Sequence, residues 1–289
     1  MEEWTRKTVC LLGLEGVQKL REAHVAVVGI GGVGAFAAEF LARAGVGHLL
    51  LVDGDVVSES NRNRQLVALQ STQGQPKVDV MAARIRDISP EADVQAFQLF
   101  LTEDSALNLL RLDDVFARTG WNCLDAVADA IDSVGPKVAL LAGCVEQGIP
   151  VVSAMGAAGK MDPARIRTVD ISRTSVCPLA KKVRHELSAK GIRQGVAAVF
   201  SDEPAGSDFF KAAGRQNAET VAAIRNAATV AGENAVTATG ECTATVAASS
   251  APKERYVPGT VSYMPAAFGG QMAAWIIQKL TLYGNDSRN

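Results

Sequence analysis

The sequence predicts an α/β fold: a Rossmann-like domain with a mostly parallel sheet that continues into a mixed, partly antiparallel C-terminal part. Three observations support this prediction. An apolar strand, a glycine-rich turn and a helix follow one another from residue 24, and a second strand ends at Asp53. Apolar runs then alternate with helical patterns to about residue 155. Residues 165–171 alternate in polarity, as a half-exposed strand does.

The composition indicates a globular protein that can bury a substantial core, as one large α/β domain or as one domain with appendages. The chain has 289 residues, 48% of them hydrophobic, and a formal net charge of −2. No global basic field points to nucleic acid, so any nucleic-acid site must be a local patch. The five cysteines form no CxxC pair, which argues against a four-thiolate zinc site and a disulfide framework and favours a reducing compartment.

We expect neither a targeting segment nor a membrane-spanning segment in this chain. Residues 1–22 are charged and interrupted rather than basic and then apolar, so we expect no signal peptide and a cytoplasmic protein. The one membrane candidate, residues 263–283, contains Gln271, Gln278 and Lys279, and its apolar run is shorter than the ~20 residues that span a bilayer. We expect no stable membrane insertion and predict a core or dimer-interface helix there.

The N-terminal half is predicted to contain a helical arm and a Rossmann-like region. The arm covers residues 1–23 and has an apolar stripe formed by Leu11, Leu12, Leu14, Val17 and Leu20. The Rossmann-like region covers residues 24–155. Its strands are expected at residues 25–28, 49–52, 94–100, 123–128 and 151–153. Its helices are expected at residues 35–44, from Pro76 to about Ile85, and at 103–110 and 136–147.

Residues 156–202 are predicted to complete the same domain. Their elements are a strand at 165–171, a basic helix at 179–190 and a strand at 196–200. Residues 203–256 are rich in alanine, threonine, serine and glycine with few large apolar residues, so we interpret them as a variable, partly mobile insertion. Residues 257–283 return to apolar sequence and are expected to end in a closing helix.

The turn after the first strand predicts a phosphate-binding site. It reads GIGGVG over residues 29–34, and glycines without a Cβ let the backbone approach a phosphate closely. The unpaired N–H groups and the positive dipole end of the next helix point at the same place. Asp53, at the tip of the second strand, is placed to hold a ribose hydroxyl. We therefore predict nucleotide binding.

Charged residues beyond this turn favour adenylation over redox chemistry. Arg64 and Lys77 are placed to meet phosphate oxygens, and Asp132, which follows a strand, is placed to hold a divalent metal. Attack on an α-phosphorus requires charge neutralisation on the phosphoryl oxygens and the departing pyrophosphate, which cations and Mg²⁺ provide. A nicotinamide oxidoreductase needs no such cluster. It stays an alternative, which a comparison of ATP with NAD binding would separate.

Several motifs together resemble the ubiquitin-activating-enzyme-like superfamily of ATP-dependent adenylating enzymes. They are the GIGGVG turn, Asp53 with Asp55, Asn61 with Asn63-Arg64-Gln65, GQPK at residues 74–77 and DAIDS at residues 129–133. Within this superfamily the chain is most similar to the tRNA threonylcarbamoyladenosine dehydratases. The similarity includes WTRKTVCLLGLEGVQKL in the arm and SAMGAAGKMDPARI, DIS, CPLAKKVR and VFSDE after residue 152.

The resemblance implies a reaction and a site. ATP adenylates the carboxylate of threonylcarbamoyladenosine beside a tRNA anticodon, and intramolecular attack then closes a ring with net loss of water, while AMP and pyrophosphate leave. The implied catalytic residues are Arg64, Lys77, Asp132 and Arg6, of which Asp132 holds Mg²⁺. The implied nucleotide-binding residues are Gly29, Gly31, Gly32, Gly34, Asp53, Asp55, Asn61, Arg64, Gln65, Lys77 and Asp129.

Some of these roles have alternatives. Arg6 is implied to reach across a homodimer to the partner's triphosphate, and its alternative is a solvated surface charge. Asp129 has an alternative role as a strand-end cap that leaves Asp132 to the metal. A monovalent cation (Na⁺ or K⁺) is a further candidate cofactor, and a cysteine desulfurase of a sulfur relay is a further candidate partner.

Two other functions stay open on the sequence. One is an adenylyltransferase that activates the C-terminus of a small sulfur-carrier or ubiquitin-like protein, although the CxxC…CxxC zinc site that such enzymes generally add is not evident. The other is a non-catalytic nucleotide-binding partner, which would tend to lose Arg64 and Lys77.

We expect tRNA to dock on a local basic surface after the nucleotide region. Its residues are Lys160, Arg165, Arg167, Arg173, Lys181, Lys182 and Arg184. The alternative is a solvated helix face with strand-edge cations that discourage aggregation.

Overall fold

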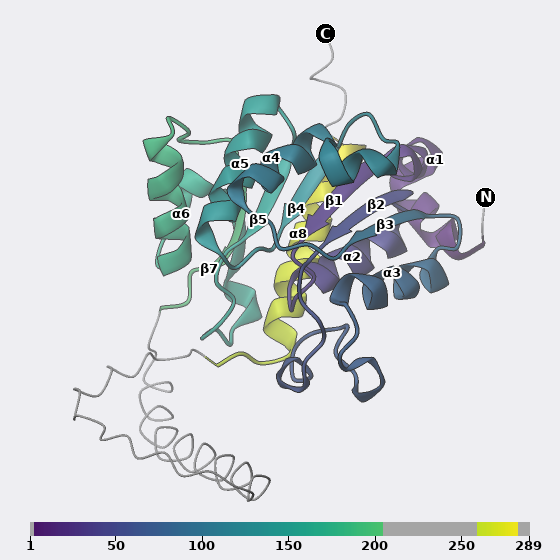
Figure 1. Cartoon of the computed structure of the whole chain (residues 1–289), viewed down its shortest axis with the longest axis horizontal. Coiled ribbons are helices and arrows are strands. Elements are labelled where there is room, and N and C mark those ends of the chain that lie inside the picture. The colour runs from purple at the N-terminus through teal and green to yellow at the C-terminus, as the bar shows by residue number, and fades with distance from the viewer. Residues whose placement is uncertain (1–2, 205–258, 283–289) are drawn as a thin grey trace, which may run out of the picture. The chain divides into compact units, whose positions relative to one another are not determined.

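The computed structural model describes residues 3–204 and 259–282 (Figure 1). The chain divides into two units, Met1–Glu203 with Thr260–Asn289, and Pro204–Gly259. The described residues belong almost entirely to the first unit. The insertion expected at residues 203–256 lies outside the described residues, apart from Glu203 and Pro204.

A seven-stranded sheet forms the centre of the first unit, in the order β3-β2-β1-β4-β5-β7-β6 (Figure 1). Its strands are β1 (His24–Val28), β2 (His48–Val52), β3 (Asp93–Phe97), β4 (Ala126–Asp129), β5 (Val151–Ala154), β6 (Ile166–Asp170) and β7 (Ala197–Ser201). Neighbouring strands are parallel except β6 with β7, which are antiparallel. The predicted fold class is therefore confirmed, including the mixed, partly antiparallel C-terminal part.

Helices cover both faces of the sheet (Figure 1). They are α1 (Arg6–Glu22), α2 (Gly34–Ala44), α3 (Lys77–Ile88), α4 (Glu103–Arg111), α5 (Val134–Gln147), α6 (Pro178–Ala189) and α8 (Tyr263–Thr281). Short 3-10 helices lie at Glu3–Thr5, Glu59–Asn61, Gln70–Thr72, Asp114–Thr119, Pro163–Arg165 and Ile171–Arg173. None of the helices in the described part of the chain has the length and apolarity needed to cross a membrane.

The alternation of side chains along the strands produces two hydrophobic cores. Successive residues of a strand point to opposite faces of the sheet. In β1, Val25 and Val27 pack in the core formed with α1, α2, α3 and α8. Ala26 and Val28 pack in the core formed with α4, α5 and α6. Because both faces are covered, the central strands β1, β2, β4 and β5 are almost wholly buried and largely apolar. The edge strands β3 and β6 carry polar residues and are partly exposed.

The closing helix α8 completes the first core from the far end of the chain. Gly269 lets α8 lie directly against α2, because a Cβ at this position would lie 2.6 Å from the Val33 carbonyl oxygen. Phe268 and Met272 are fully buried in the same core. The residues before and after the 204–259 unit are thus parts of one packed domain.

Several element boundaries differ from the expected ones by one to three residues. The strand expected at 94–100 ends at Phe97, and the strand expected at 123–128 spans Ala126–Asp129. The helix expected to begin at Pro76 begins at Lys77. Pro76 keeps an extended ψ of 132° and forms a bridge with Val56, so it caps the helix from outside.

The expected apolar stripe of the arm is wrong for two of its residues. Val17 and Leu20 are buried, whereas Leu11 and Leu14 are exposed. For Leu11 the cause is Gly13, whose φ of 74° and ψ of 171° interrupt α1. Leu11 therefore precedes the break and does not continue the helical face that carries Val17 and Leu20.

Candidate nucleotide-binding site

A cavity of about 500 Å³ opens at the carboxyl ends of β1, β2, β4 and β5. The strand order reverses here, because β2 and β3 lie on one side of β1 whereas β4 and β5 lie on the other. Open α/β sheets bind ligands at such a position. The sequence-predicted residues that line it are Gly29, Gly31, Gly32, Asp53, Asp55, Asn61, Arg64, Gln65, Lys77 and Asp132. Gly34, Asp129 and Arg6 were predicted for the same site but are not among its lining residues.

Glycines shape the turn between β1 and α2. Gly29 has a φ of +89°, and a Cβ on it would lie 2.7 Å from the Ala130 carbonyl oxygen. A Cβ on Gly34 would lie 1.8 Å from the Gly29 carbonyl oxygen. Gly34 therefore allows α2 to begin against the end of β1, while Gly31 and Gly32 face the cavity. The positive end of the α2 dipole lies beside that cavity.

Asp53 ties this turn to the end of β2. Its carboxylate accepts hydrogen bonds from the backbone N–H of Ile30 at 2.6 Å and of Asp55 at 2.8 Å. Burial raises the pKa of Asp53, while these two hydrogen bonds and the Lys77 charge oppose the rise. Each carboxylate oxygen has a second lone pair, so the group can also accept a hydrogen bond from a ribose hydroxyl in the cavity.

Lys77 and Asp55 form an ion pair at the cavity. The Nζ–Oδ2 distance is 2.6 Å, and the Lys77 side chain is 5% exposed whereas that of Asp55 is 54% exposed. Lys77 is the first residue of α3, where a cation opposes the helix dipole. A nearby anion is therefore needed to offset this unfavourable interaction of Lys77 with the helix dipole, and Asp55 supplies it.

The loop before α3 contributes amide and guanidinium groups to the cavity. Arg64 donates to the Ser60 carbonyl oxygen and to Asn63 Oδ1, both at 2.9 Å. Both partners are uncharged, so the guanidinium keeps its net charge for a ligand. Asn61 accepts from the Ser58 N–H at 3.2 Å. The Oε1 atom of Gln65 is buried and has no hydrogen-bond partner among the described residues.

Asp129 and Asp132 occupy different environments. Asp129 is fully buried, accepts hydrogen bonds from Ser153 Oγ at 2.6 Å and the Ile131 N–H at 3.1 Å, and lies 2.7 Å from Lys137 Nζ. Asp132 is exposed and lines the cavity. The strand-end role weighed for Asp129 fits this closed network, and Asp132 is the carboxylate that a metal could reach.

Two residues of this region were not predicted from the sequence. Lys137 is fully buried and also donates to the Ile131 carbonyl oxygen at 3.0 Å. A lysine inside an otherwise apolar helix was the signal that could have found it. Phe100 lines the cavity although it is 68% exposed. Its ring occupies the space that a Cβ on Gly54 would need, at 2.4 Å.

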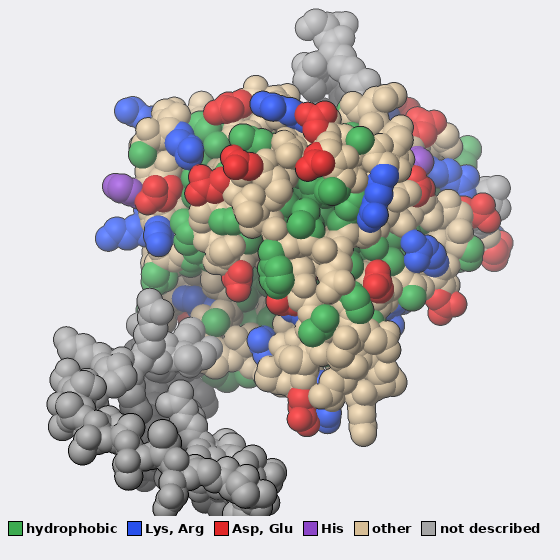
Figure 2. All heavy atoms as spheres, in the orientation of Figure 1, with side chains coloured by type: hydrophobic (Ala, Val, Ile, Leu, Met, Phe, Trp, Pro, Cys, Tyr) green, Lys and Arg blue, Asp and Glu red, His purple; other side chains and the backbone are tan. Residues whose placement is uncertain are grey.

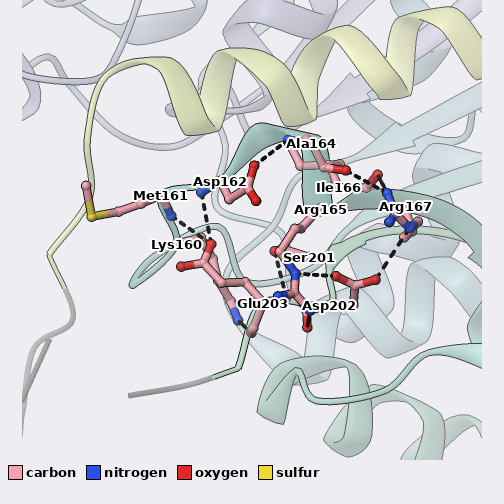
Figure 3. Close-up of polar contacts among 10 residues, drawn as sticks. All are labelled: Lys160, Met161, Asp162, Ala164, Arg165, Ile166, Arg167, Ser201, Asp202 and Glu203. Atoms are coloured by element: carbon pink, nitrogen blue, oxygen red, sulfur yellow. Dashed lines mark hydrogen bonds and ion pairs between the residues drawn. The ribbon is translucent and has the colours of Figure 1, made fainter. Parts of the chain in front are cut away.

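Arg6 and the expected basic surface lie elsewhere. Arg6 pairs with Glu3 at 3.3 Å on the exposed arm. The prediction of one exposed basic surface is wrong for Lys160, which is 5% exposed. Arg165 and Arg167 pair with Asp202 at 2.8 and 3.4 Å (Figure 3), and Arg165 lowers the pKa of that carboxyl.

The other four residues of the expected basic surface also differ from one another, because one is hydrogen-bonded within the protein and three are exposed. Arg184 donates to the Thr174 carbonyl oxygen at 2.9 Å, whereas Arg173, Lys181 and Lys182 are exposed. Figure 2 shows lysine and arginine side chains interspersed with aspartate and glutamate on the face in view. The local charge is therefore more balanced than the sequence pattern suggested.

Comparisons with known proteins agree with this geometry. The sequence profile of the ThiF family matches residues 5–289. A Bacillus subtilis (strain 168) protein named tRNA threonylcarbamoyladenosine dehydratase is 50% identical over 192 residues, which are 66% of this chain and 72% of that protein. A Salmonella typhimurium molybdopterin-synthase adenylyltransferase is 36% identical over 148 residues, 51% of this chain and 54% of that protein.

The fold also resembles a solved structure. The crystal structure of the Escherichia coli tRNA N6-threonylcarbamoyladenosine dehydratase in complex with ATP superposes with a TM-score of 0.74 at 31% identity. The match covers 99% of this chain and 96% of that one.

Proposed function

We propose, from the premise that this chain belongs to the ThiF family, that it is an ATP-dependent tRNA threonylcarbamoyladenosine dehydratase, a ligase that releases AMP and pyrophosphate. One observation carries the proposal: the cavity unites the glycine turn and Asp53 with two cations, Arg64 and Lys77, and with Asp132. Hydride transfer makes no use of such cations, whereas displacement at an α-phosphorus needs them.

ATP would lie along the carboxyl edge of the sheet. Its triphosphate would meet the α2 N-terminus, Asn61, Arg64 and Lys77, and its ribose would meet Asp53. The exposed ring of Phe100 beyond Asp53 offers a flat apolar face to the base, and a base stacked on an aromatic side chain gains about 1–3 kcal/mol.

The donor set fits Mg²⁺. No group of three metal-ligating side chains occurs among the described residues, but Asp132 offers one exposed carboxylate at the cavity. Mg²⁺ in nucleotide sites usually takes one or two carboxylates together with substrate phosphates. When bound there, the ion would neutralise charge on the phosphoryl oxygens. A monovalent cation remains a prediction from the resemblance alone.

The chain's own residues would then act on two successive displacements. An oxygen of the substrate carboxylate attacks the α-phosphorus, the bond to pyrophosphate breaks, and Arg64 and Lys77 stabilise the departing charge. A nucleophile of the same modified nucleoside next attacks the acyl carbon, gives up its proton and displaces AMP. The ring closes, and the nucleoside has lost one water whose oxygen remains on AMP.

We also propose that the active form is a homodimer. Arg6 lies outside the cavity of its own chain, so the expected contact with a triphosphate requires a second copy. Leu11 and Leu14 on the same arm expose apolar side chains, which a second copy would cover. The arm therefore carries both the reason for association and the residue that crosses the interface.

The proposed partner outside the dimer is tRNA in the cytoplasm. Arg173, Lys181 and Lys182 are the exposed members of the expected basic surface and would oppose its phosphates. A cysteine desulfurase remains a sequence-based prediction, for which Cys10 and Cys123 are the exposed cysteines of the described residues.

ATP–pyrophosphate exchange tests the proposed function. Exchange should require tRNA that carries threonylcarbamoyladenosine and should not respond to a sulfur-carrier protein with a C-terminal glycine. Exchange that follows the carrier protein and ignores the tRNA would favour the adenylyltransferase instead. NAD binding without ATP binding would favour the oxidoreductase.

A further inference from the structure

A buried polar clamp joins the loop after β5 to the end of β7 (Figure 3). The Glu203 carboxylate accepts hydrogen bonds from the backbone N–H of Met161 at 2.9 Å and of Asp162 at 3.0 Å, both at Oε2. Lys160 Nζ donates to the backbone carbonyl oxygen of Glu203. We call these two residues the Lys160–Glu203 clamp.

The clamp buries two charged side chains, which a connection between two loops does not require. Lys160 and Glu203 are 5% and 8% exposed, and burying charged side chains is costly unless they are well hydrogen-bonded. Replacing buried charged groups with apolar residues of similar volume is often neutral or stabilising, so stability alone does not account for these two residues. Asp202 lies between Ser201, the last residue of β7, and Glu203. Its carboxylate pairs instead with Arg165 and Arg167. The buried clamp therefore fixes the position of the loop rather than merely filling space.

The loop that the clamp holds forms one wall of the cavity. Residues 154–158 line it, directly before Lys160. Gly156, Ala157 and Ala158 have small side chains, so the backbone is accessible along this wall. In residues 3–204 and 259–282 no acceptor pairs with the backbone N–H groups of these three residues. These donors are therefore available to an anionic ligand.

This wall lies at the end of the cavity away from the nucleoside. Asp53 and Phe100 place the ribose and the base near β2 and β3, and the glycine turn on β1 places the phosphates at the centre. The sheet order continues through β4 to β5, so the loop after β5 lies on the opposite side of the phosphates. A carboxylate that attacks the α-phosphorus must approach from a side that the nucleoside does not occupy.

We propose that residues 156–158 bind the substrate carboxylate through their backbone N–H groups, and that Lys160 and Glu203 are the positioning residues that hold this wall. The inference rests on the proposed function, because it concerns the second substrate of the same cavity. It assigns no contact with ATP to the clamp.

Four variants of the whole chain test this inference. Glu203→Ala removes the acceptor of both N–H groups, and Lys160→Met removes the ammonium while keeping an apolar stem. Glu203→Gln retains an oxygen that can accept the same two hydrogen bonds. The matched control is Asp170→Ala, whose carboxylate accepts from the backbone N–H of Ser172 and Gly195 at the other end of the β6–β7 pair.

The measurements are the ATP dissociation constant by calorimetry and the steady-state kinetics with tRNA that carries the modified nucleoside. Glu203→Ala and Lys160→Met should each lower kcat/KM for the tRNA by roughly 10- to 100-fold, as displacement of a reacting group does. The ATP dissociation constant should stay at the wild-type value. Glu203→Gln should recover most of the lost kcat/KM, and Asp170→Ala should change neither quantity.

Three results would overturn the inference. ATP affinity that falls in step with kcat/KM would make the loop a nucleotide wall, and an equal loss in Asp170→Ala would make the effect a general one of the sheet edge. Wild-type kinetics in either Glu203→Ala or Lys160→Met would show that the clamp does not position the wall. The test therefore needs only one of these two variants to fold. A wild-type chain that binds ATP but never converts this tRNA would refute the proposed function itself.

Discussion

Two lysine–aspartate pairs at the same edge of the sheet have similar geometry and different burial. Lys137 Nζ lies 2.7 Å from Asp129 Oδ2, and both side chains are 0% exposed. Lys77 Nζ lies 2.6 Å from Asp55 Oδ2, and the Asp55 side chain is 54% exposed. Identical residue types at nearly equal distances thus sit in a closed and in an open environment.

The surroundings assign the two pairs different roles. In the closed pair the Asp129 carboxylate also accepts from Ser153 and Ile131, and Lys137 also donates to the Ile131 carbonyl oxygen. This network fixes the chain between β4 and α5, from which Asp132 projects. In the open pair we expect phosphate oxygens of the proposed ATP to replace the Asp55 side chain as the partner of Lys77. Burial rather than composition therefore separates a structural ion pair from one that can bind a ligand.

The largest expected effect is on stability, from breaking the closed pair. Lys137→Met leaves the Asp129 carboxylate buried without its cation, and removing one partner of a buried pair costs about 3–5 kcal/mol. Urea unfolding followed by circular dichroism should show a loss of this size. Lys77→Met is the matched control, because the Asp55 carboxylate that it leaves unpaired is 54% exposed and stays hydrated, so the loss should be smaller. Equal losses in the two variants would contradict the distinction between the pairs.

The open pair should instead control catalysis. Lys77→Ala and Arg64→Ala should each slow adenylation by a factor on the order of 10²–10³, since each removes a charge that stabilises the transition state. ATP binding should weaken less. Pyrophosphate release measured over a range of ATP concentrations checks this. A raised KM with an unchanged kcat would show that the contact is made equally in the ground state.

A mixing experiment tests whether a second chain completes the open site. Arg6→Ala and Lys77→Ala homodimers should both be impaired. A mixed dimer has one site with its own Lys77 and the other chain's Arg6. Random exchange of subunits should therefore restore about a quarter of the wild-type rate, because half of the dimers are mixed and each has one complete site. No recovery, although subunit exchange is detected, would place Arg6 outside the site.

A third group of charged side chains, at the amino edge of the sheet, should have a smaller effect on stability than the two lysine–aspartate pairs. His24 and His48 stack with ring centroids 4.1 Å apart, beside Asp125, Asp93 and Trp121. Burial, followed by the charge of His48, lowers the pKa of His24, and Asp125 and Asp93 oppose this. The unfolded chain therefore binds more protons at His24 than the folded chain does, so stability rises with pH.

This contribution to stability is present above the unfolded pKa of about 6.5 and is lost as pH falls below it. We expect the free energy of unfolding of the wild type to fall more between pH 7.5 and pH 5.5 than that of His24→Gln, by the smallest of the effects considered. If the free energies of unfolding of the two proteins depended on pH in the same way, His24 would not be a source of this pH dependence.

The sequence predicted the elements whose signal is local. The apolar run before the GIGGVG turn and the helix after it were expected at residues 25–28 and 35–44, and they occur at His24–Val28 and Gly34–Ala44. Strand, turn and helix are encoded there by neighbouring residues. The antiparallel end of the sheet was predicted from the alternation at residues 165–171, and β6 is half-exposed, with Ile166 buried and Arg167 exposed.

Contacts between distant residues were not predictable in this way. Lys160 was assigned to an exposed basic surface, because a charge pattern does not show that Glu203 lies next to it, 43 residues away. The apolar helix around Lys137 signals that this lysine is buried, but the sequence does not identify its partner, because the return of α5 over β4 brings it to Asp129. Phe100 was placed in a strand, because an apolar residue after β3 looks the same in sequence whether it continues the sheet or faces a cavity.

The measurement that tests the central claim most directly is mass spectrometry of the nucleosides from tRNA that carries threonylcarbamoyladenosine, after incubation with the whole chain, ATP and Mg²⁺. We expect this nucleoside to lose the mass of one water only when ATP is present, with AMP and pyrophosphate formed in equal amounts. Asp132→Asn should fold like the wild type and leave the nucleoside unchanged, because the exposed carboxylate is needed for the metal and contributes little packing. An unchanged nucleoside with the wild-type chain, or a mass loss that Asp132→Asn still produces at the full rate, would contradict the central claim.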